Sequence, residues 1–134
     1  MKKTVAILLS TILGIFFIGF TSCKKESSTA DKMNGQWFVK ELKIKTIEEE
    51  HVSSYEPQLS DADYFSFKKD NNTYIRSISG AISSGSYTIL SDTRFLLNKD
   101  TAIIHNLTNK EFSFKLISKT FDQIIESDYL LQLK

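Results

Sequence analysis

The 134-residue sequence has one cysteine, one proline and two histidines, and these scarcities argue against several classes of protein. A single cysteine cannot form an internal disulfide bond. His51 and His105 are too few for a histidine-based zinc site, and they do not form the i, i+4 pair of metallopeptidase helices. The five glycines form neither a Gly-x-Ser-x-Gly elbow nor a phosphate-binding loop. We therefore predict that the protein is not an enzyme and needs no metal or cofactor.

Long hydrophobic runs are also absent, apart from one between Val5 and Phe20. This run follows Lys2 and Lys3, and it falls short of the roughly 20 apolar residues that a membrane-spanning helix needs. A positive start, an apolar stretch and small residues before a cleavage point are typical of an export signal. We predict a cleaved signal peptide over residues 1–22.

The only cysteine, Cys23, follows this signal directly, after the small residues Thr21 and Ser22. This order resembles the processing site of bacterial lipoproteins, although Phe20 stands where the usual pattern has leucine. Lipidation also explains a lone thiol in an exported chain. We predict that Cys23 carries palmitate-type acyl chains, which anchor the protein to a membrane. Two alternatives stay open: a secretory peptide cut before Ser22 or Cys23, and an uncleaved N-terminal anchor.

Both alternatives, like lipidation, place the following residues outside the cytoplasm. Lys24 stands where an aspartate retains some lipoproteins in the inner membrane, which favours the outer membrane of a bacterial cell envelope. Residues 23–33 are small, polar and without periodicity, so we predict a flexible tether there. After removal of Lys2 and Lys3, 17 − 2 = 15 basic residues oppose 16 acidic ones. This balance argues against nucleic acid as a partner.

Residues 34–134 form one domain with a repeated strand signal and no helix. Eight segments combine alternating polarity with β-branched or aromatic residues, and Asp, Asn, Ser and Gly residues separate them. Their short connections predict antiparallel hairpins. The predicted strands are residues 36–45, 64–69, 73–79, 86–90, 94–98, 102–107, 111–118 and 128–134.

Eight such strands can bury their apolar side in a sandwich or by closing into a barrel, and only closure leaves no unpaired edge. We therefore predict an all-β, eight-stranded antiparallel up-and-down barrel. Two longer segments, residues 46–63 and 119–127, interrupt the strand pattern. The first holds the only proline, Pro57, and an acidic run before His51. We expect it to form a lid or short helix over the barrel mouth.

Four short motifs follow one another along the domain. They are a Gly-x-Trp ending at Trp37, a hairpin with a charged turn from Tyr64 to Tyr74, a Gly-x-Tyr ending at Tyr87, and an Ile-x-x-Leu-Thr segment starting at Ile104. Together they resemble the bacterial lipocalin-like lipoproteins. The hairpin turn has asparagines instead of a glycine, and asparagine tolerates the left-handed backbone that a tight turn often requires. The Thr-Asp-Tyr segment and the late arginine of larger secreted lipocalins are absent, so no particular ligand is implied.

The resemblance implies that Gly35 and Trp37 lie at the closed floor of the barrel. Along this first strand Trp37 and Val39 share one face, whereas Leu42 and Ile44 share the other. A bulge near residues 40–41 would put both pairs inside. The inward positions predicted for the other strands are rich in rings: Phe65, Phe67, Tyr74, Ile78, Tyr87, Ile89, Phe95, Leu97, Ile103, Leu107, Phe112, Phe114, Leu116, Tyr129, Leu131 and Leu133.

A barrel of eight strands is just wide enough to be filled by side chains or to hold one small ligand. With so many rings inside we expect filling, and the alternative is a small apolar cavity lined by Tyr74, Tyr87 and Phe112. Arg76 has the parity of an inward residue and would hold a ligand carboxylate there, unless its strand flips and leaves it in water. His105 shares an inward parity too, but a lone histidine on an apolar strand is more often a hydrogen-bonded core or rim residue.

Two functions follow. In the first, the membrane-tethered barrel binds a small apolar ligand in or at its mouth, with residues 46–63 as a gate. In the second, a filled barrel works through its outer surface as an accessory or inhibitor subunit that contacts another envelope protein. We expect a monomer in both cases. A packed interior beside an exposed apolar patch would favour the second function.

Overall fold

The computed structural model describes residues 27–133, which comprise one short helix and nine strands. Cys23 and the predicted signal peptide lie outside the described residues. No helix within 27–133 is long and apolar enough to cross a membrane. The elements are α1 (Thr29–Met33), β1 (Gly35–Glu48), β2 (His51–Tyr55), β3 (Tyr64–Lys68), β4 (Thr73–Ile78), β5 (Ala81–Ser91), β6 (Arg94–Leu97), β7 (Asp100–Leu107), β8 (Glu111–Lys119) and β9 (Gln123–Leu133).

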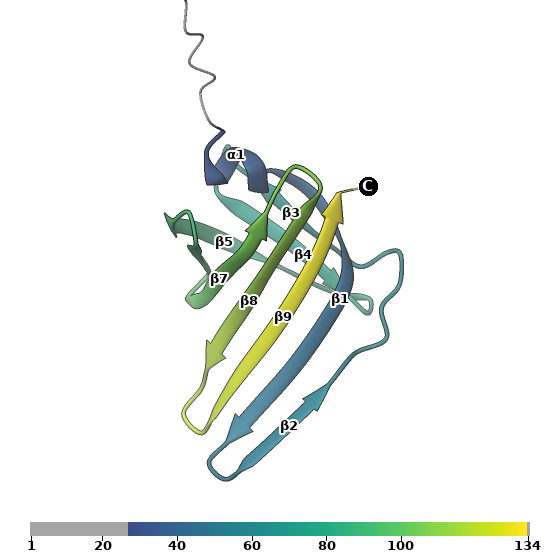
Figure 1. Ribbon diagram of the computed structural model, residues 1–134, viewed down its shortest axis with the longest axis vertical. Helices are drawn as coiled ribbons and strands as arrows, with labels where there is room; N and C mark the ends of the chain where they lie inside the picture. The colour runs from purple at the N-terminus through teal and green to yellow at the C-terminus, as the bar shows by residue number, and fades with distance from the viewer. Residues whose placement is uncertain (1–26, 134) are drawn as a thin grey trace, which may run out of the picture.

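Eight of the nine strands close into an antiparallel barrel (Figure 1). β1 pairs with β3, the strands from β3 to β9 follow one another in chain order, and β9 returns to pair with β1. The predicted eight-stranded up-and-down barrel is therefore confirmed. β2 is an additional strand, and within the described residues it pairs with β1 alone.

β1 bends at a bulge between Val39 and Glu41, where its register against β9 shifts by one residue. The shift lets the strand turn the same face inward on both sides of the bulge. Trp37, Val39 and Leu42 are buried, and Ile44 packs against the core. The predicted bulge is confirmed.

β1 is much longer than β3 and changes partner along its length. Its residues 35–38 pair with β3 and its residues 44–48 pair with β2, while β9 runs beside it from residue 37 to residue 48. The ends of β1, β2, β8 and β9 consequently project beyond the barrel (Figure 1). We call these projecting ends the hairpin sheet; it comprises residues 44–48, 51–55, 116–119 and 123–127.

The hairpin sheet stands where the sequence predicted two loops. The lid or short helix expected over residues 46–63 is wrong, because β1 continues to Glu48 and returns through a two-residue turn as β2. The loop expected over residues 119–127 is mostly strand, since β9 begins at Gln123. The strands extend because each finds backbone partners in its neighbour, as far as Glu48 opposite Gln123.

α1 covers the closed end of the barrel, and it is built from residues that we expected in the tether. Ser28 and Asp31 form a reciprocal capping box at its start. Met33 is buried, and its carbonyl accepts a hydrogen bond from Trp37 Nε1 at 2.8 Å. Gly35 has φ 133°, a conformation that side chains rarely adopt. Gly35 and Trp37 therefore lie next to α1, at the closed end of the barrel.

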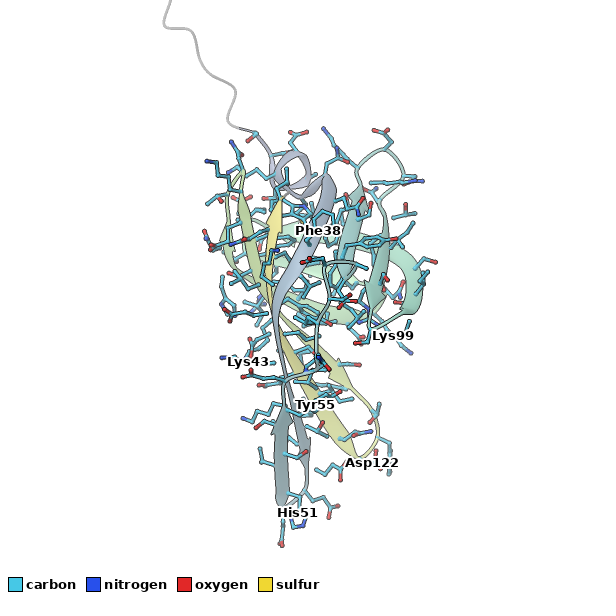
Figure 2. All side chains as sticks on the ribbon, turned by 90° about the vertical axis from the view of Figure 1, so that its right-hand side faces the viewer. Phe38, Lys43, His51, Tyr55, Lys99 and Asp122 are labelled. Atoms are coloured by element: carbon cyan, nitrogen blue, oxygen red, sulfur yellow. The ribbon has the colours of Figure 1, made fainter. Side chains whose placement is uncertain are left out.

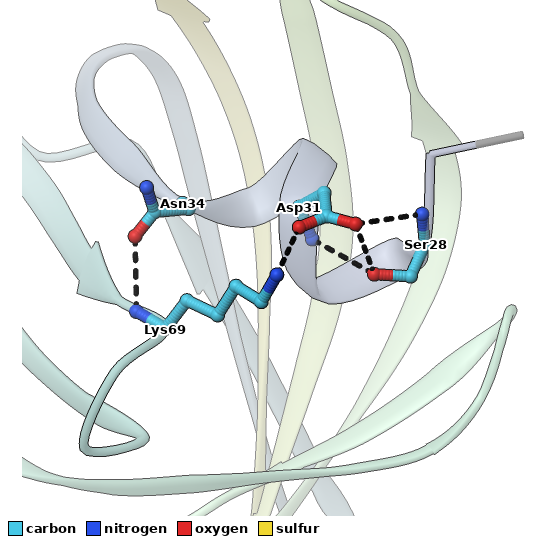
Figure 3. A network of polar contacts seen from close by, with 4 residues as sticks. All are labelled: Ser28, Asp31, Asn34 and Lys69. Carbon is cyan, nitrogen blue, oxygen red and sulfur yellow. Dashed lines mark hydrogen bonds and ion pairs between the residues drawn. The ribbon is translucent and has the colours of Figure 1, made fainter. Parts of the chain in front are cut away.

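Lys69 ties α1 to the turn between β3 and β4 (Figure 3). Its ammonium pairs with the Asp31 carboxylate, and its backbone N–H donates to Asn34 Oδ1 at 2.9 Å. Hydrogen bonds lower the pKa of Asp31 to about 2. The bond from Lys69 has the largest effect, and those from Ser28 come next. Asn72 in the same turn has φ 52°, so asparagine does take the left-handed conformation there.

Aromatic rings fill the barrel between α1 and the mouth. The ring centroid of Phe112 lies 4.9 Å from that of Phe114 and 5.7 Å from that of Trp37. Every predicted inward residue belongs to the core or packs against it, except Ile103 and Leu133. The inward position predicted for Ile103 is wrong, because its neighbours Ala102 and Ile104 face the core. Leu133 is half-exposed at the end of β9.

A core substitution tests whether side chains fill the interior of the barrel. We expect Phe112→Ala to lower the free energy of unfolding by about 3–5 kcal/mol, since it removes buried apolar surface and leaves a cavity. Phe121→Ala, at a fully exposed position in the β8–β9 turn, is the matched control and should cost less than about 0.5 kcal/mol. Urea denaturation of the full chain in mild detergent, followed by circular dichroism, measures both. Equal losses in the two variants would contradict a filled interior.

Candidate functional site

The three rings that would line a cavity, if the barrel held one, belong to the packed core. Tyr74, Tyr87 and Phe112 are all buried. Each approaches Phe67, with centroid distances of 6.5, 5.5 and 5.8 Å. These spacings are those of rings in direct contact. The three residues therefore contribute to the ring-filled interior.

The hydroxyl groups of the two tyrosines have different surroundings. Tyr74 Oη accepts a hydrogen bond from Asn98 Nδ2 at 3.1 Å. The Asn98 side chain occupies the place that a Cβ would need at Gly85, so a larger residue there would displace it. Tyr87 Oη is buried and has no hydrogen-bond partner among the described residues. Burial raises the pKa of Tyr87, with a smaller opposing effect from Lys69.

Arg76 faces the interior at the barrel mouth. It stands opposite Phe65 on β3 and opposite Ser83 on β5, and residues directly opposite in a ladder share one face. Its Nε donates a hydrogen bond to Ser83 Oγ at 3.1 Å. Its Nη1 donates a second hydrogen bond, across the barrel interior, to Tyr129 Oη on β9 at 3.4 Å. Burial raises the pKa of Tyr129, and the charge of Arg76 opposes this rise. The flipped strand that would leave Arg76 in water is wrong.

His105 lies on the outside of the barrel and shares no site with Arg76. The register between β7 and β8 shifts between Ile104 and Asn106, which leaves His105 at a bulge. Its side chain is half-exposed, and its Nε2 lies 3.9 Å from Asp128 Oδ1. The inward position considered for His105 is therefore wrong.

Asp63 fastens the connection between β2 and β3 to the barrel mouth. Its buried carboxylate accepts hydrogen bonds from the backbone N–H groups of Ser60 and Ser79, both at 2.7 Å. Its own carbonyl accepts one from Val39 N at 2.9 Å. Asp63 is thus a positioning residue for the mouth. The sequence gives little sign of this role, because an aspartate before a strand is usually a solvated turn residue.

The hairpin sheet carries exposed apolar side chains beyond the mouth. Figure 2 shows His51 and Asp122 at its two turns, at the end of the molecule opposite α1. All five residues of β2 are exposed, with Val52 at 64% and Tyr55 at 59%. Phe121, beside Asp122, is fully exposed. Water-facing apolar groups therefore occur on both faces at this end, because Val52 lies opposite Ile47 on the outer face and Tyr55 lies opposite Ile44 on the inner face.

Apolar and charged rows cross the outer face of the hairpin sheet. Ile47 pairs with Val52 on one side and with Ile124 on the other, which makes an apolar row across three strands. Nearer the barrel, Lys115 Nζ lies 3.2 Å from a carboxylate oxygen of Glu126 and also contacts Asp128 at 3.8 Å. Apolar contacts rimmed by charge are typical of protein–protein interfaces.

No family model, no curated protein and no solved structure matches this chain. Between residues 27 and 133, no three His, Cys, Asp or Glu side chains gather as a metal ion would require. The hairpin sheet is the feature that the sequence interpretation missed. Its one available signal was the alternation of β1, which continues past residue 45 into Thr46, Ile47 and Glu48.

Proposed function

We propose that the chain is a lipid-anchored lipoprotein of the bacterial cell envelope, in the lipocalin-like group, that contacts another envelope protein through its hairpin sheet. A filled barrel beside exposed apolar side chains is the observation that carries this proposal. Apolar groups gathered on a surface commonly mark a site of interaction with a protein or a membrane. In this proposal the protein is a monomeric accessory or inhibitor subunit.

The proposed anchor gives the domain an orientation. Cys23 precedes Ser27 by four residues, which span at most about 14 Å when fully extended. Because α1 follows directly and covers the floor, a lipid on Cys23 holds the floor near the membrane. The hairpin sheet leaves the opposite end of the barrel (Figure 1). Its exposed apolar groups then point away from the anchoring membrane, which favours a protein as their partner.

The anchor is tested by labelling. Cys23→Ala should abolish palmitate incorporation, because no other cysteine is present to accept the lipid. Ser27→Ala is the control and should preserve both the label and the membrane location. Palmitate retained by the Cys23→Ala chain, or an unlabelled wild-type chain in the soluble fraction, would rule the anchor out.

The contact is tested by placing a photo-crosslinking amino acid at Tyr55 in cells of the native host. Leu90, on β5, is the matched control because it is 56% exposed, close to the 59% of Tyr55. We expect one discrete protein adduct from position 55 and none from position 90, with mass spectrometry identifying the captured chain. Adducts of equal yield from both positions, or none from either, would speak against a contact through the hairpin sheet.

Arg76 favours a second candidate function, the binding of a small apolar ligand with a carboxylate at the barrel mouth. A guanidinium that faces inward can hold a carboxylate through two parallel hydrogen bonds. Arg76 is only partly buried, and its contacts with Ser83 and Tyr129 keep it at the mouth. The apolar tail would lie along the partly exposed inner face of the hairpin sheet, over Ile44 and Ile125.

A fluorescent fatty acid tests this candidate. Arg76→Gln should weaken its binding roughly tenfold or more, since a charge-assisted hydrogen bond to the carboxylate is lost. Arg94→Gln removes the same charge from an exposed position on β6 and should leave the affinity unchanged. Fluorescence titration measures all three proteins. If the wild-type chain does not bind the fatty acid, ligand binding is ruled out, and the protein contact remains as the proposed function.

A further inference from the structure

We infer that the partner binds as an extended basic segment that adds a strand to the free edge of β2. This inference rests on the proposed function and specifies the chemistry of the partner. Three observations support it: an open backbone edge, the charge around that edge, and the apolar row beside it.

The first observation is the open edge. Across residues 27–133, β2 stands last in the sheet and pairs with β1 alone. Hydrogen bonds alternate along an antiparallel strand, so every second residue directs its N–H and C=O groups away from the paired neighbour. The turn between β1 and β2 has two residues, and Glu48 and His51 form its closing pair. The closing pair is hydrogen-bonded, so His51, Ser53 and Tyr55 direct their backbone groups toward β1. Val52 and Ser54 direct theirs to the free edge.

Apart from its short length of five residues, this edge lacks the features with which proteins usually protect a terminal strand. Lysine, proline, a bulge or a covering loop are the common protections. β2 contains neither lysine nor proline, and its five residues pair with β1 in regular register. The backbone groups at the free edge are thus available to another strand, which is the basis of recognition by strand addition.

The second observation is charge. Residues 48–56 contain four glutamates and no lysine or arginine. Lys43 Nζ lies 3.7 Å from Glu56, which offsets only one of the four. Asp122 lies at the same end, where it lines one depression together with residues 48–51. A segment with lysine or arginine on both sides of its strand would complement this field.

The same charges argue against a second copy of the chain. Antiparallel pairing of two β2 strands about Ser53 would place Glu50 of one copy opposite Glu56 of the other, at both ends of the new ladder. Like charges directly opposite each other destabilise a strand pair. Pairing of two copies in this register is therefore disfavoured, which supports a different chain as the occupant of the edge.

The third observation is the apolar row of Val52, Ile47 and Ile124 on the outer face. A strand added to β2 continues this row with the side chain that lies opposite Val52. Side chains alternate between the two faces of a strand, so the added segment should be apolar at every second position. A suitable probe is therefore a peptide in which every second residue of the centre is apolar and both ends carry lysines.

The probe is the fluorescein-labelled peptide KKTVTVTKK, and its control is EETVTVTEE, which has the same core and the opposite flanks. Fluorescence anisotropy measures binding to the full chain in mild detergent. We expect KKTVTVTKK to bind, with an affinity that falls as salt is added, and EETVTVTEE to bind at least about tenfold more weakly. Equal binding of the two peptides, or no binding of KKTVTVTKK, would overturn the inference.

Two variants at one position localise the site. Ser54→Pro removes an outward N–H without breaking the ladder to β1, so it should abolish binding of KKTVTVTKK. Ser54→Ala keeps the backbone donor and should bind as the wild type does. If Ser54→Pro binds normally, strand addition at β2 is wrong. A cross-link from position 55 that survives Ser54→Pro in cells would also defeat strand addition, while leaving the proposed contact through the hairpin sheet intact.

Discussion

The ladder between β1 and β9 is the interaction on which the rest of the structure depends. Its eleven residue pairs close the barrel and continue into the hairpin sheet, with one bulge between Val39 and Glu41. β1 has 14 residues whereas β3 has five, so β3 can cover only the start of β1. Further along the same edge, residues 44–48 of β1 pair with β2, because exposed backbone groups need partners and a neighbouring strand supplies them. A mismatch of strand lengths thus creates the surface that the proposed function uses.

The filled interior limits where recognition takes place. Rings in contact leave the closed half of the barrel rigid, in keeping with the close packing of protein cores. Polar groups at its margin form hydrogen bonds with other groups of the protein. Tyr74 accepts one from Asn98, and the N–H of Ser79 donates one to Asp63. In both proposed functions, binding therefore takes place either at the mouth, where Arg76 is partly buried, or on the hairpin sheet beyond it.

Strong periodicity allowed much of the barrel to be predicted from the sequence. The bulge near Lys40 followed from the parity change between Val39 and Leu42, and the ring-rich strands marked the core. β2 carried no such signal, because neither of its faces is buried and pairing with β1 imposes its conformation. α1 has only five residues, too few for a helical period, and depends on its cap and on burial of Met33. Lipidation of Cys23 stays a prediction from the sequence.

The shared strand β1 also determines how the molecule would respond to tension. If a lipid holds the floor and a partner holds the hairpin sheet, a pulling force runs along the axis of β1 and β9. The load enters at the start of β1 and leaves through β2, so the five pairs between β1 and β2 carry it in shear and resist sliding together, whereas a force across the strands would open them one at a time. In the proposed arrangement, the tension therefore falls on backbone hydrogen bonds at the end of β1 and not on the packed core of the barrel.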